Sequence, residues 1–206
     1  MPPPFLLVFA EPNGSGKSTL VLEIADRGMD LGEQINPDII AATLTGEYGA
    51  RVREAQSIAD ARRDACLAEK RSFSFETVMS HPSKLEIMRA ARDAGFSVTL
   101  YFVGVEDPSI NIDRVALRVA QGGHDVPPDR VVARYGRTMK LLASAIGIAH
   151  RAVIFDNSSI GDDPDLWLRP VAATSGDGEA FEIEYVVSPD ASDFPDWVKK
   201  YLPSPR

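Results

Sequence analysis

A glycine-rich stretch near the start of the chain has the residue types that bind phosphate. In "FAEPNGSGKSTL" (residues 9–20), two glycines precede Lys17 and Ser18. Glycines allow a tight turn that points backbone N–H groups at phosphate oxygens, and a helix that follows adds partial positive charge. A lysine then reaches the outer phosphates, and a serine hydroxyl binds Mg²⁺. We therefore expect a nucleotide phosphate site with Ser18 as the Mg²⁺ ligand, formed by Pro12, Asn13, Gly14, Ser15, Gly16, Lys17, Ser18 and Thr19.

Glu11 stands where such a loop usually has its first glycine. Glycine suits that position because its backbone is unhindered, whereas a carboxylate near a triphosphate is repelled unless it points away or is neutralised. Two interpretations follow: Glu11 turns outward and is harmless, or it weakens or reshapes nucleotide binding. We expect the outward orientation, because residues 14–18 would be hard to explain in a loop that had lost its function.

Two further stretches place polar side chains after expected strands. Asp38 in "NPDIIA" follows the second strand, and Glu76 in "FSFETVMSHP" ends the third, with Thr77 and His81 after it. Ligands bind at the carboxyl ends of strands in open α/β sheets, so Asp38 could accept the proton of an attacking hydroxyl and Glu76 could hold substrate. The alternative for Asp38 is a helix cap, and the alternative for His81 is a residue at a helix start.

Basic residues cluster between residues 114 and 140 of an otherwise acidic chain. They lie on two expected helices joined by "QGGHDVPP", a glycine-containing connection that would suit a lid. Arginines that close over a transferring phosphate neutralise its charge. Any single arginine could instead belong to a solvated face paired with neighbouring aspartates, but the cluster favours a function. Its members are Arg114, Arg118, His124, Arg130, Arg134 and Arg137.

The elements that must position these residues alternate between strand and helix. We expect strands at residues 5–10, 33–40, 72–76, 96–105 and 151–156, and helices at 18–27, 48–70, 82–94, 107–120 and 128–149. Such alternation predicts a mostly parallel five-stranded sheet covered on both sides, an α/β three-layer sandwich. Residues 162–206 differ, with a hairpin around "TSGDG" and a last helix in "DFPDWVKKYL".

Composition limits the classes of protein and partner. The 206 residues are enough for one α/β domain and short for two, so we expect a single domain over residues 1–206 with 162–206 as its appendage. A net charge of −8 argues against general binding to nucleic acid or an anionic membrane. The single cysteine excludes an internal disulfide. No signal peptide or membrane span is evident in the sequence, so the cytoplasm is the expected location.

Taken together, these features resemble the zeta-toxin family of P-loop kinases. The matching stretches run in order from residue 4 to residue 158: "PNGSGKST", "NPDIIA", "FSFETVMSH", "ALRVAQGGHDVPPDRVVARYGRT" and "AVIFDNS". The resemblance implies a P-loop kinase fold, use of ATP and Mg²⁺, and phosphate transfer to a hydroxyl of a small molecule. In this family the acceptor is a UDP-activated amino sugar, chiefly UDP-N-acetylglucosamine, and a small antitoxin protein blocks the nucleotide site.

The resemblance also implies roles for individual residues. Lys17 and Ser18 match the lysine and hydroxyl of the loop, Asp38 matches the catalytic base, and Glu76 matches a glutamate that contacts substrate. Arg118 matches an arginine that clamps the phosphates. For a second lid residue, His124 occupies the nearest equivalent place, with Arg130 and Arg134 as alternatives.

Two other functions fit the same residues. One is a nucleotide-binding interaction module in which Glu11 impairs catalysis. The other is a kinase whose acceptor is a nucleoside or an RNA end. The acidic charge of the chain argues against binding of a long RNA.

Overall fold

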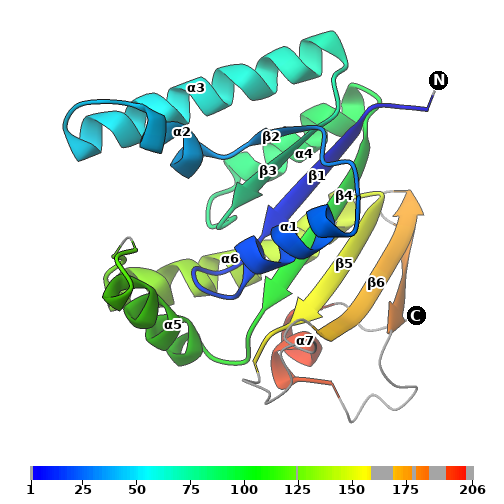
Figure 1. Ribbon diagram of the computed structural model, residues 1–206. Coiled ribbons are helices and arrows are strands. Elements are labelled where there is room, and N and C mark those ends of the chain that lie inside the picture. The colour runs from blue at the N-terminus through cyan, green and yellow to red at the C-terminus, as the bar shows by residue number, and fades with distance from the viewer. Residues whose placement is uncertain (1, 124, 159–168, 178–179, 186–193, 203–206) are drawn as a thin grey trace.

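The computed structural model describes residues 2–123, 125–158, 169–177, 180–185 and 194–202. These residues form one mixed sheet with helices on both faces (Figure 1). The strand order is β2-β3-β1-β4-β5-β6-β7, and the pairs among the first five strands are parallel. The strands are β1 (Phe5–Ala10), β2 (Glu33–Ile35), β3 (Phe73–Thr77), β4 (Ser97–Gly104), β5 (Arg151–Asp156), β6 (Arg169–Asp177) and β7 (Ala180–Tyr185).

The helices divide unequally between the two faces of the sheet. They are α1 (Lys17–Asp26), α2 (Pro37–Thr43), α3 (Tyr48–Glu69), α4 (Ser83–Asp93), α5 (Pro108–Ala120), α6 (Pro128–Ile148) and α7 (Asp196–Tyr201). Helix α1 covers one face, where Leu20 packs with Leu7 and Phe9. Residues of α3, α4, α6 and α7 pack on the other face in the larger core cluster. None of the helices in the described ranges is long and apolar enough to cross a membrane.

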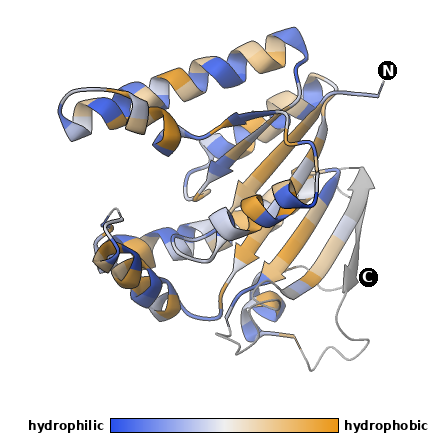
Figure 2. Ribbon diagram, viewed as in Figure 1, coloured by the Kyte–Doolittle hydropathy of each residue, from blue (hydrophilic) through white to orange (hydrophobic). Residues whose placement is uncertain are grey.

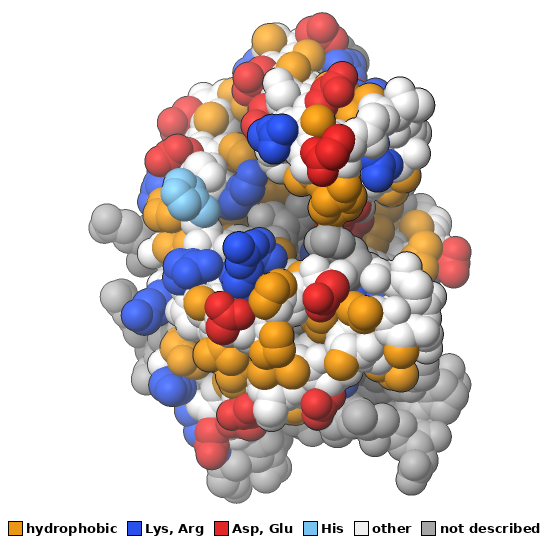
Figure 3. All heavy atoms as spheres, turned by 90° about the vertical axis from the view of Figure 1, so that its left-hand side faces the viewer, with side chains coloured by type: hydrophobic (Ala, Val, Ile, Leu, Met, Phe, Trp, Pro, Cys, Tyr) orange, Lys and Arg blue, Asp and Glu red, His pale blue; other side chains and the backbone are white. Residues whose placement is uncertain are grey.

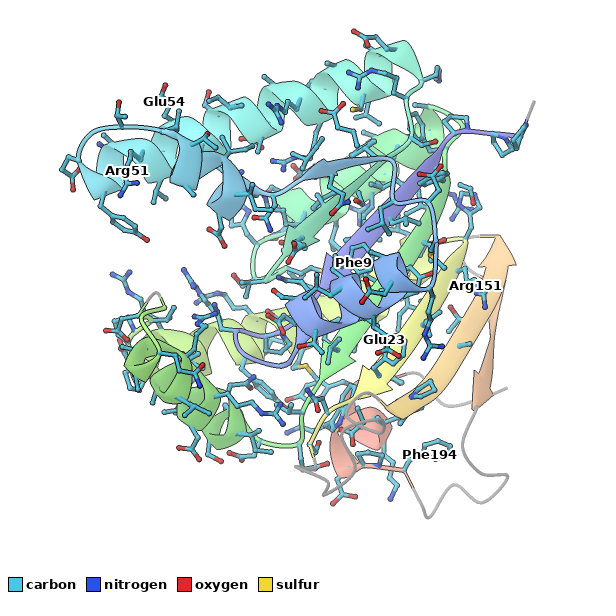
Figure 4. The ribbon with its side chains drawn as sticks, viewed as in Figure 1. Phe9, Glu23, Arg51, Glu54, Arg151 and Phe194 are labelled. Carbon is cyan, nitrogen blue, oxygen red and sulfur yellow. The ribbon has the colours of Figure 1, made fainter. Side chains whose placement is uncertain are left out.

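Alternation along β1 explains how one strand serves both layers. Leu6 and Val8 point into the larger cluster, whereas Leu7 and Phe9 face α1. Phe9 stacks on Tyr101 of β4 with ring centroids 5.2 Å apart (Figure 4). Because β1 is central and buried on both faces, it reads as a continuous apolar run, and Figure 2 shows the same hydrophobic colour along the neighbouring strands.

The predicted fold class is confirmed, with two corrections. The C-terminal hairpin is not separate from the sheet: β6 pairs antiparallel with β5, and β7 with β6, which extends the sheet to seven strands. The expected strand over residues 33–40 ends at Ile35, because Asn36 caps a short helix that begins at Pro37. The division of the chain into one domain with an appendage stays a prediction.

A buried tryptophan fixes α7 against the sheet. Trp197 is 1% exposed, and its Nε1 donates a hydrogen bond of 2.8 Å to Oδ1 of Asp156 at the end of β5. Its ring packs near Phe102 and lies directly over Gly104, where a Cβ atom would be 2.5 Å from the nearest ring carbon. Gly104 is therefore required by the close approach of the indole.

Replacing Gly104 tests this packing. We expect Gly104→Ala to lower the free energy of unfolding by about 1–3 kcal/mol, because the added methyl group collides with a rigid, buried ring. The measurement is urea unfolding followed by circular dichroism. Gly136→Ala is the matched control, because a Cβ there meets nothing within 4 Å and the site is helical. The control should be neutral or slightly stabilised, and equal losses in both variants would contradict the packing argument.

Candidate active site

The site is formed at the carboxyl ends of three neighbouring strands. The phosphate loop follows β1, Glu76 lies near the end of β3, and Asn36 follows β2. These strands are adjacent in the sheet, so their carboxyl ends meet at one edge. Lys17, Glu76 and Asn36 are brought together there.

The loop after β1 has the backbone form of an anion-binding turn. Gly14 and Gly16 have positive φ angles, 84° and 112°. A side chain at Gly14 would also press on α5, with a Cβ 3.1 Å from the carbonyl oxygen of Asn111. Ser15 is fully buried, its hydroxyl accepts from Nδ2 of Asn111 at 2.9 Å, and its carbonyl accepts from Nδ2 of Asn157 at 2.7 Å. The loop is thus held in shape by α5 and by the segment after β5.

Glu11 points into this loop, and the expectation that it turns outward is wrong. Its side chain is 11% exposed, and its Oε2 accepts a hydrogen bond of 2.8 Å from the backbone N–H of Lys17. Its Oε1 lies 3.9 Å from Nζ of Lys17. The backbone gives the reason, because the N–H of Glu11 donates to the carbonyl of Thr77 and continues the β1–β3 pairing by one residue. The carboxylate therefore takes one of the N–H groups that a phosphate would use.

Burial sets the ionisation of Glu11. The loss of hydration raises the pKa of its carboxyl above the usual range, and Glu76 acts in the same direction. Lys17 and the N–H groups of Lys17 and Gly16 act in the opposite direction. Desolvation is the largest of these effects, so the charged form is held at a net energetic disadvantage.

Lys17 is bound mainly by Glu76. Its Nζ lies 2.6 Å from Oε2 of Glu76, and the other oxygen, Oε1, accepts from Nδ2 of Asn36 at 2.7 Å. Asn36 in turn caps α2 by accepting the N–H of Asp38 at 2.9 Å. A chain of hydrogen bonds thus runs from the phosphate loop to the helix that carries Asp38.

Asp38, Thr77 and His81 differ in their surroundings. Asp38 lies in the first turn of α2 with an exposed side chain, and the helix cap is Asn36, not Asp38. Thr77 is buried, and its Oγ1 accepts the N–H of Met79, a residue in the left-handed region at φ 52°. His81 is exposed and contacts Ser83 at the start of α4. Asp38 is thus open to an acceptor, whereas Thr77 shapes the turn after β3.

The basic residues of α5 and α6 lie on the other side of the loop. Arg134 reaches it directly, with Nη1 3.3 Å from Oδ1 of Asn13. Arg118 and Arg130 are exposed. Figure 3 shows the molecular face on which α2–α3 and α5–α6 meet, with a hollow between them and Lys and Arg side chains at its rim. The predicted residue His124 lies outside the described residues.

Asn36 was not among the residues chosen from the sequence, and Arg114 was chosen only as a member of the basic cluster. Asn36 links Glu76 to α2, a role signalled by the "INPD" pattern of a helix cap before proline. Arg114 was grouped with the other arginines, but it packs beside Gly14, while Arg118 is exposed. Burial lowers the pKa of the Arg114 guanidinium. The nearby carboxylates of Glu11 and Asp156 act in the opposite direction and raise it. This places a partly buried cation close to Glu11.

The site fits Mg²⁺ only in the manner of a phosphate-bound ion. Ser18 is exposed in the first turn of α1, directly after the lysine. Within the described ranges, His, Cys, Asp and Glu form no group of three or more that could hold a metal. Mg²⁺ commonly takes most of its ligands from phosphates and water, and the Ser18 hydroxyl is the group of the loop that would bind it.

A separate groove lies between α3 and α4. It has a volume of about 570 Å³, and its lining includes Asp60, Arg63 and Lys84. None of its lining residues belongs to the phosphate loop or to the chain of hydrogen bonds around Lys17. This groove is therefore distinct from the site around Lys17.

Comparison with known proteins supports the fold. No family model matches the sequence. The chain is 28% identical over 139 residues to an uncharacterised protein of Haemophilus influenzae, covering 63% of this chain and 91% of that one. Among solved structures, it is similar to the AvrRxo1-ORF1:AvrRxo1-ORF2 complex crystallised with ATP, with a TM-score of 0.65, 16% identity, and coverage of 98% of this chain and 72% of that one.

Two other solved structures share the fold over a shorter range. The PezAT toxin–antitoxin system of Streptococcus pneumoniae gives a TM-score of 0.52 at 13% identity, covering 75% of this chain and 67% of that one. A proposed kinase of Chloroflexus aurantiacus gives a TM-score of 0.50 at 18% identity, covering 65% of this chain and 78% of that one. At these identities the likeness shows a P-loop kinase-like fold, and the chemistry has to be argued from the residues.

The raised pKa of Glu11 predicts a pH-dependent effect of its neutral analogue. The folded state holds the Glu11 proton more tightly than the unfolded state, so ionisation of this group lowers stability as the pH rises through its folded pKa. Glu11→Gln keeps an acceptor for the Lys17 N–H and removes the charge. We expect its melting temperature to exceed that of the wild type by a few degrees at pH 7–8.

The gain should shrink as the pH falls towards the ordinary glutamate pKa of about 4.3 and disappear below it, where this carboxyl is protonated in both the folded and the unfolded wild type. The measurement is thermal unfolding by circular dichroism across this pH range. Glu23 of α1, whose side chain is 43% exposed, supplies the control Glu23→Gln at a site with much less burial than Glu11. A variant that is less stable than the wild type at neutral pH would contradict the dominance of desolvation at Glu11.

Proposed function

We propose that this protein is an ATP-dependent kinase that transfers phosphate to a hydroxyl group of a small metabolite. The observation that carries the proposal is the hydrogen-bonded connection from Lys17 through Glu76 and Asn36 to the helix of Asp38. A phosphate loop alone would fit many nucleotide-binding proteins. A carboxylate beside the loop, open to an acceptor, is what phosphate transfer to an alcohol requires.

The loop and the lid would share the binding of the nucleotide. The N–H groups of residues 14–18 and the Lys17 ammonium bind the phosphate oxygens, with Ser18 on Mg²⁺. Arg134 already contacts the loop at Asn13, and Arg118 stands at the last turn of α5. These arginines would neutralise charge on the transferred group. Mg²⁺, held by the Ser18 hydroxyl, would supply neutralisation of the phosphate charge.

Asp38 would act as the base. The acceptor hydroxyl oxygen forms a bond to the terminal phosphorus, the bond from that phosphorus to the bridging oxygen breaks, and the hydroxyl proton passes to the Asp38 carboxylate. Glu76 would position Lys17, and through Asn36 the start of α2. His81, Arg130 and His124 are proposed to contact the acceptor or close over it, whereas Thr77, expected from the sequence to do the same, is buried and shapes the turn after β3.

The acceptor and partner are proposed from likeness. The resemblance to zeta toxins supports a UDP-amino sugar such as UDP-N-acetylglucosamine as the first acceptor to test. The AvrRxo1 and PezAT structures are, by name, a two-protein complex and a toxin–antitoxin system. We therefore propose that an antitoxin-like protein partner covers the nucleotide site of this chain.

One observation favours a second candidate, a nucleotide-binding module with little turnover. The Glu11 carboxylate occupies an N–H group of the loop and lies 3.9 Å from Nζ of Lys17. A nucleotide that failed to displace it would bind in a position unsuited to transfer. Nucleotide binding without phosphate transfer to any acceptor would support this candidate over the kinase.

Two substitutions separate binding from chemistry. We expect Asp38→Asn to reduce phosphate transfer by about 100-fold or more while ATP still binds, because the base is lost and the loop is untouched. Lys17→Ala should abolish tight ATP binding. The measurements are calorimetry with ATP and mass spectrometry of a metabolite extract incubated with labelled ATP, with UDP-sugars as defined acceptors.

Asp93→Asn serves as the matched control, because Asp93 is an exposed aspartate at the last residue of α4. It should transfer phosphate like the wild type. If Asp38→Asn also does so, Asp38 is not the base. If wild-type protein phosphorylates nothing in the extract, the kinase proposal fails.

A further inference from the structure

The Glu11 carboxylate takes the place of an anion at the start of α1. The N-cap residue of this helix is Gly16, which offers no side-chain hydrogen bond. The N–H of Lys17, in the first turn, is bound instead by Oε2 of Glu11 from across the loop. Negative charge at this end of a helix is favoured by the helix dipole, so Glu11 satisfies the loop as a phosphate would.

The same N–H group cannot serve both anions. A nucleotide phosphate in the loop needs the backbone N–H and the ammonium group of Lys17. Oε2 of Glu11 accepts that N–H, and Oε1 of Glu11 lies 3.9 Å from Nζ of Lys17. A carboxylate that stayed there would also repel the phosphate. Binding of a nucleotide therefore requires this side chain to leave its present position.

A cation with unused hydrogen-bonding capacity lies nearby. Arg114 projects from α5, whose backbone packs on Gly14 of the loop, and its charge interacts with that of Glu11. Among the described residues, no group accepts a hydrogen bond from its buried Nη1 atom. Buried donors are rarely left unpaired, so this atom marks a position where an acceptor is expected.

We infer that Glu11 is an internal stand-in for a nucleotide phosphate, bound to the Lys17 N–H in the free protein and transferred to Arg114 when a nucleotide enters. The inference rests on the nucleotide use proposed above and adds a regulation of that same site. The free loop is kept satisfied by its own carboxylate. Nucleotide affinity is correspondingly lower than in a loop without this competitor.

The first test measures affinity with Mg²⁺·ADP as the probe, by calorimetry at fixed pH and salt. We expect Glu11→Ala to bind ADP about tenfold or more tightly than the wild type, because a charge-assisted hydrogen bond no longer has to be broken. Glu11→Gln should fall between them, since its amide still accepts the N–H without charge. Glu23→Ala is the control, at a glutamate of α1 whose side chain is 43% exposed, and it should match the wild type.

The second test asks where the carboxylate goes. Arg114→Gln is made in the wild type and in Glu11→Ala. If Arg114 receives Glu11, the substitution weakens ADP binding several-fold in the wild type and much less in Glu11→Ala. If Arg114 instead contacts the nucleotide, the loss is equal in both backgrounds, and the transfer to Arg114 is overturned.

The Lys17 amide gives a readout that does not depend on affinity. In ¹⁵N-labelled protein, its resonance should differ between free wild type and free Glu11→Ala, and should become alike in the two when ADP is bound. Identical free resonances, or equal ADP affinities for the wild type and Glu11→Ala, overturn the inference. The two proposals can fail separately. If Glu11→Ala binds ADP more tightly but the protein phosphorylates no acceptor, the inference about Glu11 is supported and the kinase proposal is contradicted.

Discussion

The charge of Lys17 has to be balanced inside the protein, and this requirement organises the site. The lysine side chain is only 13% exposed, so its ammonium has lost most of its water. Oε2 of Glu76 lies 2.6 Å from it and Oε1 of Glu11 lies 3.9 Å away. An unpaired charge in this place would be strongly destabilising. Because the two carboxylates come from the ends of β3 and β1, the need to neutralise one lysine couples adjacent strands to the phosphate loop.

The same balance bears on the nucleotide binding proposed above. Its phosphates bring several negative charges to a place that already holds two carboxylates and one lysine. Glu76 accepts short hydrogen bonds from the Lys17 ammonium and from Asn36, which fixes it to α2, whereas Glu11 is bound by the backbone N–H of Lys17 with a weaker contribution from that of Gly16. Glu11 is thus the carboxylate that can move with the smaller loss of contacts. The partly buried Arg114 and the loop contact of Arg134 supply positive charge on the α5–α6 side.

Much of the fold could be predicted because short sequence patterns indicate many of its strands and helices. The apolar run of β1, the glycines after it and the prolines that open α5 and α6 each carry their own signal, and the observed elements match them closely. The exception is α2, which begins at Pro37 where a strand was expected. The continuation of the sheet through β6 could not be read in this way, since it depends on the pairing of β6 with β5. Spacing also grouped Arg114 with Arg118, but packing of α5 against Gly14 decides which one lies beside the loop.

The orientation of Glu11 shows most clearly what a local pattern leaves out. Comparison with the usual loop identifies Glu11 as a departure, and Coulomb repulsion from a triphosphate argues that it points away. That argument assumes a nucleotide is present. In the free loop the nearest charges are Lys17 and the end of a helix, both of which attract a carboxylate. The hydrogen bond from the Glu11 N–H to Thr77 then directs the chain so that the side chain reaches inward. The same residue is therefore attracted by the empty loop and repelled by the filled one, and a glutamate at this position makes the two states of the loop chemically different.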